Sequence, residues 1–225
     1  MSVTAFLPCR YGSKRIKNKN TRPISNFPNG LVEIKLKQLL SSSLISKIYL
    51  STNDKTIIKY AESMNNEKIY INKRHDSLCS ENTTTDDLIK FAAEILPDDD
   101  ILWTHVTSPL ISSKDYDDII KSFYKSISDG YDSLVTVTVL QSFIWDEFGP
   151  FNYSENKQKW PFTQDIKKLY EINSGAFIAN KDIYKRLNNR LGEKPKYFIL
   201  DKLQSLDIDN LDEFNLVEKI LDSLQ

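Results

Sequence analysis

Short apolar runs alternate along the chain with longer stretches in which apolar residues recur every three or four positions. The strand-like runs cover residues 3–8, 47–51, 68–72, 101–106 and 133–140. The helical spacing covers residues 31–44, 57–64, 84–96 and 113–130, and Asn53 or Asp54 can cap the second of these helices. Strands that alternate with helices of this length are typical of an α/β fold. The pattern predicts a mostly parallel sheet with helices on both faces.

The alternation stops between residues 141 and 170, where aromatic and polar residues dominate and prolines stand at positions 150 and 161. It resumes with a strand at 176–179, a helix opened by Asn180, a strand at 197–200 and a last helix from Asn210. We therefore expect one domain over residues 1–225, with 141–170 inserted as an arm. An aromatic arm of this kind can form a dimer interface, although a lid or a packed loop fits the same pattern.

Composition and charge narrow the class of protein. The 225 residues include 30 Lys and Arg against 31 Asp and Glu, a formal net charge of −1, which argues against a generally basic nucleic-acid binder. No apolar run reaches the length of a membrane span, and no export signal is visible at the start. The two cysteines, Cys9 and Cys79, cannot build a disulfide framework. We expect a cytoplasmic protein with neither nucleic-acid nor membrane partners, in which both cysteines are small buried residues.

The first 30 residues hold six cations and no Asp or Glu. Most of these cations follow the first predicted strand, and in a parallel sheet the loop after a strand lies at the ligand-binding edge. Gly12, Ser13, Lys14 and Arg15 offer backbone donors and positive charge there, which favours a polyphosphate ligand over a merely solvated loop. The dinucleotide fingerprint and the P-loop are both missing, so dehydrogenases and P-loop ATPases lose support.

The other end of the chain is acidic. Residues 201–225 contain seven acids against two lysines, and Asp207 and Asp209 alternate just before the last helix. Mg²⁺ commonly takes one or two carboxylates while substrate phosphates supply its other ligands. Turn and cap chemistry is the alternative interpretation of this pair, and Asp100 is a weaker metal candidate.

Six segments, in order along the chain, together resemble one family. They are Leu7-Pro8-Cys9-Arg10-Tyr11-Gly12-Ser13-Lys14-Arg15-Ile16 with Lys19-Asn20, Leu50-Ser51-Thr52-Asn53-Asp54, the stretch from Arg74 to Asp87, His105-Val106-Thr107-Ser108-Pro109-Leu110, Glu171-Ile172-Asn173-Ser174-Gly175-Ala176, and Leu206-Asp207-Ile208-Asp209. The set is similar to the signatures of the acylneuraminate cytidylyltransferases, which make CMP-sialic acid and related CMP-nonulosonates.

The resemblance implies a nucleotide-diphospho-sugar transferase fold, a homodimer, and Mg²⁺-dependent transfer of CMP from CTP to an acidic sugar with release of pyrophosphate. It implies catalytic roles for Arg10, Lys14 and Lys19, and metal binding by Asp207 and Asp209. It also implies contacts to nucleotide or acceptor from Gly12, Ser13, Asn20, Arg74, His105, Thr107, Ser108, Gln164 and Asn173. From the residues alone, His105 at a strand end is equally well a structural histidine, and Trp103 is most simply a core residue.

Two positions depart from the family pattern near the expected acceptor. Ile111 stands where an arginine usually follows Ser-Pro-Leu, and Thr163 stands where a basic residue is common. The loss of two cations keeps open an alternative acceptor, a phosphorylated small molecule attacking through a phosphate oxygen. A non-catalytic nucleotide-binding subunit is a third hypothesis, which the paired basic and acidic segments argue against.

Overall fold

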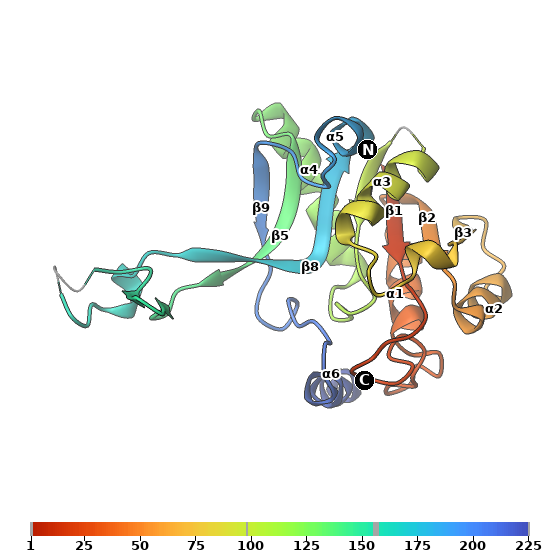
Figure 1. The fold of residues 1–225 in the computed structure, drawn as a ribbon, viewed down its shortest axis with the longest axis horizontal. Helices are drawn as coiled ribbons and strands as arrows, with labels where there is room; N and C mark the ends of the chain where they lie inside the picture. Colours follow the sequence, from red (N-terminus) through yellow and green to blue (C-terminus); the bar gives the residue numbers. More distant parts are fainter. Residues whose placement is uncertain (1, 98, 155–157, 225) are drawn as a thin grey trace.

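A seven-stranded sheet forms the centre of the protein in the computed structural model, which describes residues 2–97, 99–154 and 158–224. Its strands are β1 (Val3–Pro8), β2 (Ile45–Thr52), β3 (Ile69–Lys73), β4 (Asp100–Trp103), β5 (Ser133–Leu140), β8 (Leu169–Asn180) and β9 (Pro195–Ile199). They lie in the order β3-β2-β1-β4-β8-β5-β9, and β8 alone runs antiparallel to its neighbours (Figure 1). The predicted mostly parallel sheet is confirmed.

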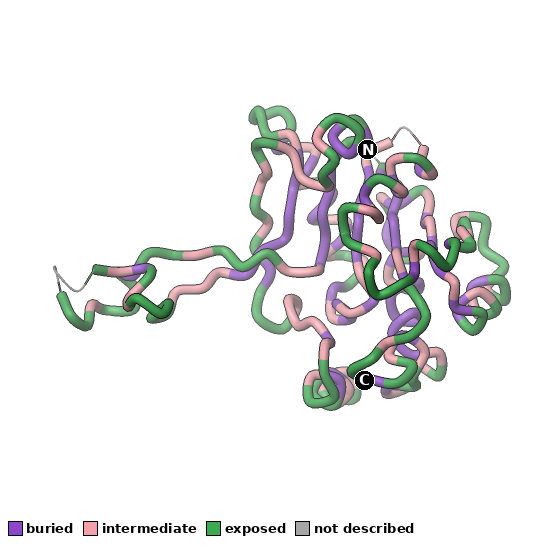
Figure 2. Tube along the Cα trace, in the orientation of Figure 1, coloured by how far each residue is buried: buried purple, intermediate pink, exposed green. Residues whose placement is uncertain are grey.

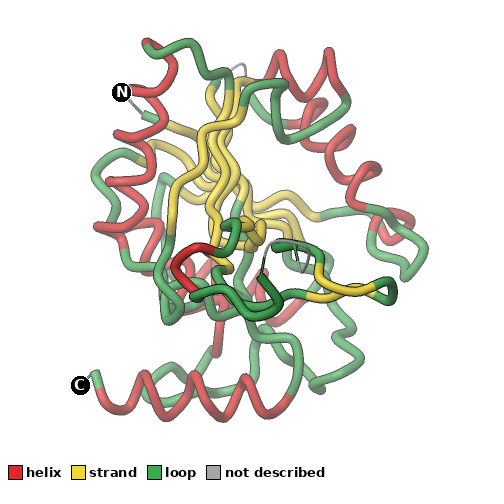
Figure 3. Tube along the Cα trace, turned by 90° about the vertical axis from the view of Figure 1, so that its left-hand side faces the viewer, coloured by secondary structure: helices red, strands yellow, loops and turns green. Residues whose placement is uncertain are grey.

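Helices cover both faces of this sheet (Figure 3). One layer contains α1 (Gly30–Ser41), α2 (Lys55–Ser63) and α4 (Ser113–Ser128), and the other contains α3 (Thr85–Ile95) and α5 (Lys181–Leu187). The last helix, α6 (Leu211–Ser223), joins the first layer's core through Phe214 and Val217. Single 3-10 turns occur at η1 (Asp76–Leu78) and η2 (Thr163–Asp165). None of the helices in the described residues combines the length and apolar character that crossing a bilayer requires.

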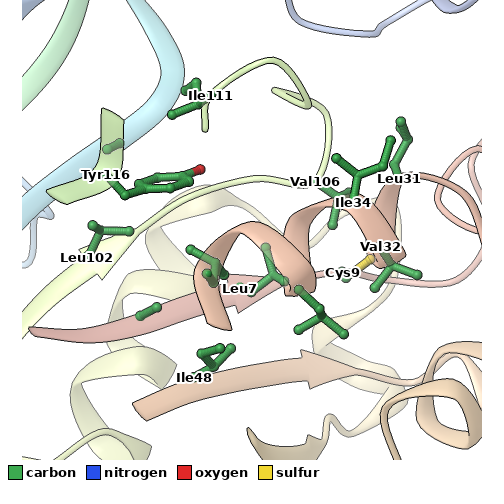
Figure 4. Close-up of a cluster of buried hydrophobic side chains, with 14 of the residues drawn as sticks. Leu7, Cys9, Leu31, Val32, Ile34, Ile48, Leu102, Val106, Ile111 and Tyr116 are labelled. Carbon is green, nitrogen blue, oxygen red and sulfur yellow. The ribbon is translucent and has the colours of Figure 1, made fainter. Parts of the chain in front are cut away.

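Alternate residues of each central strand face opposite layers. In β1, Ala5 and Leu7 pack toward α1 and α4, whereas Phe6 packs toward α3 and α5. Figure 4 shows the first of these clusters, and Figure 2 shows the buried strands running through the middle of the molecule. Trp103 is 1% exposed in the second cluster, as its interpretation as a core residue requires.

The helices begin where the sequence supplies caps. Thr84 with Asp87, Ser112 with Asp115, and Asn210 with Glu213 form complete capping boxes at α3, α4 and α6. A cap of this kind is worth about 1 kcal/mol. Asp54 and Asn180 cap α2 and α5 through their side chains.

Three boundaries differ from the sequence pattern by three residues or more. Strand β4 ends at Trp103 rather than at 106, because residues 104–109 turn across the edge of the sheet. Helix α1 ends at Ser41, so Leu44 packs from the following loop. Strand β8 begins at Leu169 rather than at 176, because its first residues pair with the end of β5 at the base of the arm.

The arm, residues 141–170, projects from the body of the domain (Figure 1). Its described part contains the two-stranded sheet of β6 (Trp145–Asp146) and β7 (Gly149–Pro150), and residues 155–157 lie outside the description. The aromatic side chains that it exposes are Phe143, Trp145, Phe148, Phe151, Trp160, Phe162 and Tyr170. Phe148 is 90% exposed, so this surface is not packed against the domain that carries it.

Candidate active site

Loops from distant parts of the chain meet at the carboxyl edge of the parallel strands. The loop after β1 contacts the segment after β9, because Lys19 Nζ donates a hydrogen bond of 2.6 Å to the carbonyl oxygen of Ile208. The Ile208 amide in turn donates to the carbonyl oxygen of Thr107, in the loop after β4, at 2.9 Å. The basic beginning and the acidic end of the sequence therefore adjoin, as the topology of a parallel sheet predicts.

A cationic cavity of about 410 Å³ opens between the loops after β1 and β4. Seven of the predicted site residues line it: Arg10, Ser13, Lys14, Lys19, Asn20, His105 and Thr107. Gly12 stands at the turn of the basic loop with a φ of +88°, a conformation that side-chain-bearing residues rarely adopt. The cavity thus presents cations and hydroxyl groups from a tight turn, an arrangement suited to phosphate oxygens.

Hydrogen bonds anchor the basic loop at several points. Asn20 Nδ2 donates to the carbonyl oxygen of Arg10 at 3.2 Å, and Lys14 forms an exposed ion pair of 2.6 Å with Glu81. Cys9, beneath the loop, is 2% exposed, and burial raises the pKa of its thiol to about 12. A thiol in that state is not a nucleophile at neutral pH, which supports the interpretation of Cys9 as a small core residue.

An acidic pocket of about 480 Å³ lies beside the cationic cavity, between β8 and the segment before α6. Its charged lining consists of Glu171, Asp207, Asp209, Glu213 and Lys202. Asp209 belongs to this pocket and also accepts from Arg15 at 2.9 Å and lies 3.6 Å from Lys19 Nζ. Asp209 therefore lies between the cationic cavity and the acidic pocket.

Asp207 and Asp209 alternate around Ile208, which is completely buried. Asp207 Oδ2 accepts from Ser174 Oγ at 3.1 Å, while Asp207 Oδ1 is buried and has no hydrogen-bond partner in the part of the chain described. A buried carboxylate oxygen without a donor fits a hard cation, which takes oxygen ligands. Among the described residues no group of three or more His, Cys, Asp or Glu could hold a metal, so a cation here would depend on this pair and on ligands from the substrate.

A bulge in β8 shapes the acidic pocket. The register with β5 shifts between Val135 and Val137, so residues 173–176 of β8 lie opposite Thr136. Thr136 Oγ1 donates to Asn173 Oδ1 at 2.6 Å, and Asn173 Nδ2 donates to Thr138 Oγ1 at 3.1 Å. Asn173 lines the pocket as predicted, but its amide is engaged within the protein. Bulges of this type often re-aim side chains next to active sites, and here the bulge points Ser174 at Asp207.

Four predicted ligand residues do not line either cavity: Gly12, Arg74, Ser108 and Gln164. Arg74 is 4% exposed and donates to the carbonyl oxygen of Ser51 at 2.9 Å, while its Nε lacks a partner among the described residues. Ser108 is 2% exposed, and its carbonyl oxygen accepts a hydrogen bond from Lys35 Nζ at 2.7 Å. Gln164 belongs to the arm, where its carbonyl oxygen accepts from Gln141.

Ile111 is completely buried in the cluster under α1 and α4 (Figure 4). A Cβ on Gly175 would come within 2.7 Å of its Cδ1, so the isoleucine fills space beneath the bulge. Position 111 therefore supplies no positive charge to the acidic pocket. Lys202 is the one lysine or arginine in the described lining of the acidic pocket.

The most unexpected group near the site is Lys35, which sequence reasoning treated as an ordinary helix position. Its side chain is completely buried, and Nζ donates to the carbonyl oxygen of Ser108 and to Tyr116 Oη, both at 2.7 Å. Burial lowers the pKa of this ammonium group to about 7, although the charge of Asp207 opposes the shift. The only available signal was a lysine within an otherwise apolar face of α1.

Comparisons with known proteins match nearly the whole chain. The family model described as Cytidylyltransferase matches residues 4–220. An N-acylneuraminate cytidylyltransferase of Escherichia coli O18:K1:H7 is 26% identical, over 95% of this chain and 51% of the relative, so the chain spans about half the length of that protein. Flagellin modification protein B of Campylobacter coli is 25% identical over 97% of this chain and 94% of the relative. A CMP-N,N'-diacetyllegionaminic acid synthase of Legionella pneumophila is 24% identical over 99% and 97%.

Solved structures show the same fold at lower identity. A CMP:2-keto-3-deoxy-manno-octonic acid synthetase complexed with CTP superposes with a TM-score of 0.70 and 13% identity, covering 100% of both chains. A 4-diphosphocytidyl-2C-methyl-D-erythritol synthase of Anaerococcus prevotii gives 0.66 and 14%, covering 98% of this chain and 96% of that one. At these identities the likeness shows the fold alone, and it agrees with the predicted nucleotidyltransferase architecture.

Proposed function

The chain belongs to the cytidylyltransferase family, and from that premise we propose that it transfers CMP from CTP to an acidic sugar of the nonulosonate type, with release of pyrophosphate. One observation carries the proposal. The cationic cavity and the acidic pocket adjoin where Lys19 Nζ lies 3.6 Å from the Asp209 carboxylate. A reaction between a nucleoside triphosphate and a second substrate needs two such adjacent compartments.

The cationic cavity is the proposed site of the triphosphate. Arg10, Lys14 and Lys19 would neutralise charge that develops on the phosphate oxygens during in-line displacement at the α-phosphorus. Of these, Lys19 is the most firmly placed, because its side chain is 13% exposed and is held by the Ile208 carbonyl oxygen. Ser13 and Thr107 offer neutral donors beside it.

The acidic pocket is the proposed site of the acceptor. Lys202 is the cation in its lining that can pair with a carboxylate, and Asn173, Ser174 and Thr138 offer polar groups for hydroxyls. Asp207 and Asp209 would hold Mg²⁺ between the two substrates. When bound, that ion neutralises charge on the triphosphate and favours departure of pyrophosphate.

The arm is the proposed dimer interface. Seven exposed aromatic residues on an extension of the domain favour burial against a second copy. In such a dimer Gln164 would reach the active site of the partner rather than its own. The two free, buried cysteines agree with a reducing compartment, and we place the reaction in the cytoplasm.

The reaction is tested by incubating the protein with each of the four nucleoside triphosphates, Mg²⁺, and a panel of acidic sugars and phosphorylated acceptors. We expect pyrophosphate and a CMP-linked product only with CTP and an acidic sugar. Product from a phosphorylated acceptor alone would replace the proposed acceptor class. The absence of pyrophosphate in every combination would refute an enzymatic role.

The dimer is tested by mixing two inactive variants, Asp209→Asn and Gln164→Ala, after mild dissociation. Random pairing makes about half of all dimers mixed, and each mixed dimer has one intact site out of two, so activity returns to about a quarter of the wild-type value. Light scattering on the wild-type protein provides the companion measurement. A monomer, or no recovery on mixing when each variant alone is inactive, contradicts the arrangement.

A further inference from the structure

The imidazole of His105 has one ring nitrogen held by two groups that can only donate hydrogen bonds. Trp103 Nε1 donates to His105 Nε2 at 3.1 Å, and a guanidinium nitrogen of Arg190 lies 3.3 Å from the same atom. Neither an indole N–H nor a guanidinium has a lone pair to offer. Nε2 therefore accepts, and the proton of the neutral ring is on Nδ1.

Arg190 is positioned by aromatic rings. Its guanidinium carbon lies 3.7 Å from the ring centroid of Phe177 and 5.1 Å from that of Trp103. No carboxylate lies within ion-pair distance of it among the residues described. Because the flat guanidinium rests on rings from β8 and β4, its positive charge faces His105 without being neutralised by an acid.

The remaining ring nitrogen, Nδ1, is available to a ligand. His105 lines the cationic cavity, and its Nδ1 is not fully buried and has no hydrogen-bond partner within the described chain. The surrounding charges keep the ring neutral: burial, with the positive charges of Arg190, Lys35 and Lys19, lowers the pKa of His105 to about 3. Cations reach it from the loop after α5, from α1 and from the basic loop.

We infer that His105 is a hydrogen-bond donor of fixed polarity, and that Arg190 is the positioning residue that fixes it. Nδ1–H would donate to an oxygen acceptor on the bound substrate, either a phosphate oxygen of the nucleotide or a hydroxyl oxygen of the sugar. The identity of that substrate rests on the proposed function, whereas the tautomer does not. A ring whose Nδ1 already carries the proton and whose Nε2 is occupied cannot be the general base that activates the acceptor hydroxyl.

The tautomer can be read directly in the free protein, because the chain contains only two histidines, His75 and His105. We propose ¹⁵N-histidine labelling with two-bond ¹H–¹⁵N spectra from pH 8 to pH 5, with a His75→Asn variant to assign the signals. The account predicts a neutral ring protonated on Nδ1 throughout this range. An Nε2-protonated ring, or an imidazolium at pH 7, would overturn the inference.

The role of Arg190 is tested by Arg190→Met, with Arg186→Met as the matched control. Arg186 pairs with Asp182 on the exposed face of α5 and does not contact His105. We expect Arg190→Met to introduce Nε2-protonated ring or to bring protonation of His105 into the range studied, Arg190→Lys to restore the wild-type signal in part, and Arg186→Met to change nothing. If Arg190→Met folds, as judged by circular dichroism, and leaves the signal unchanged, Arg190 is not the positioning residue.

The substrate contact is tested by adding CTP alone and N-acetylneuraminate alone to the labelled protein. A shift of the Nδ1–H signal with CTP assigns the contact to a phosphate oxygen, and a shift with the sugar assigns it to a hydroxyl oxygen. If both ligands bind and neither moves the signal, the contact is wrong. Turnover measured on the same sample separates that result from a failure of the proposed reaction.

Discussion

The two hollows at the carboxyl edge of the sheet differ in how firmly their charges are placed. In the cationic cavity, the Lys14 and Arg15 side chains are 66% exposed and extend from a turn. In the acidic pocket, Asp207 is held by Ser174 on a bulge that Asn173 and Thr136 lock with hydrogen bonds. The Lys14 and Arg15 side chains can therefore reorient around a ligand, whereas Asp207 is held in place before any ligand binds.

Lys19 is the exception that joins the two regions. It belongs to the basic loop by sequence, but its side chain is 13% exposed, donates to the Ile208 carbonyl oxygen and lies beside Asp209. Position in the fold, rather than the number of charges, therefore separates a preorganised group from an adaptable one.

Asp209→Asn should reduce turnover by at least about 100-fold, because it removes one of the two proposed metal carboxylates while keeping the shape of the side chain. The measurement is pyrophosphate release at saturating CTP and Mg²⁺. Asp212→Asn, in the first turn of α6, is the control and should keep its activity. Retained activity in Asp209→Asn with an unchanged circular dichroism spectrum would refute the metal assignment.

Lys19→Met should lower kcat by about 10-fold to 100-fold, whereas Lys14→Met should mainly raise the KM for CTP by about 10-fold or less. The reason is that Lys19 is fixed at the junction and Lys14 pairs with Glu81 in solvent. Steady-state kinetics measure kcat and the KM for CTP of both variants, with Lys17→Met as the control. Equal effects from Lys14 and Lys19 would remove the distinction between adaptable and preorganised cations.

Gly175→Ala should destabilise the protein by about 1–3 kcal/mol, because a Cβ there would lie 2.7 Å from Ile111 Cδ1 and 2.8 Å from Thr136 Oγ1. Urea unfolding measures the loss. Ser174→Ala, the neighbouring change, removes the hydrogen bond to Asp207 without crowding the bulge, so it should affect turnover more than stability. A Gly175→Ala variant as stable as the wild type would show that the bulge yields easily.

Lys35→Met should change the pH dependence of stability. The folded pKa of Lys35 is about 7, whereas an unfolded lysine titrates near 10.4. Between these values the unfolded chain binds more protons, so the free energy of unfolding of the wild type rises with pH by up to about 1.4 kcal/mol per unit. Below about pH 7 this slope disappears, since both states are protonated.

Urea unfolding at pH 7, 8 and 9 compares the two proteins. The stability of the wild type relative to Lys35→Met should increase with pH across this range. If the difference in free energy of unfolding between the two proteins does not change with pH, the pKa of Lys35 is not lowered by burial in the folded protein.

Most of the fold could be predicted from the sequence, because the hydrophobic periodicity of strands and helices depends on residues close together in the chain. The capping boxes of α3, α4 and α6 likewise pair residues only three positions apart. The sequence also placed the basic and acidic segments at one edge, since parallel topology brings strand ends together. Residues whose role depends on tertiary packing were not predictable. Lys35 and Arg190 look like surface residues in the sequence, but the fold buries Lys35 completely and packs Arg190 against the rings of Trp103 and Phe177.

We propose that the cationic cavity binds CTP and that the CMP group, which contains the α-phosphorus, is transferred beside Asp209 to an acidic sugar. The most direct test of this proposal is transfer of label from CTP carrying ³²P at either the α or the γ position, with Mg²⁺ and N-acetylneuraminate or a related nonulosonate. The account predicts α-label in a CMP-sugar product and γ-label in pyrophosphate, both lost in Asp209→Asn. Retention of the α-label in CTP with every acidic sugar, in a protein that binds CTP, would contradict it.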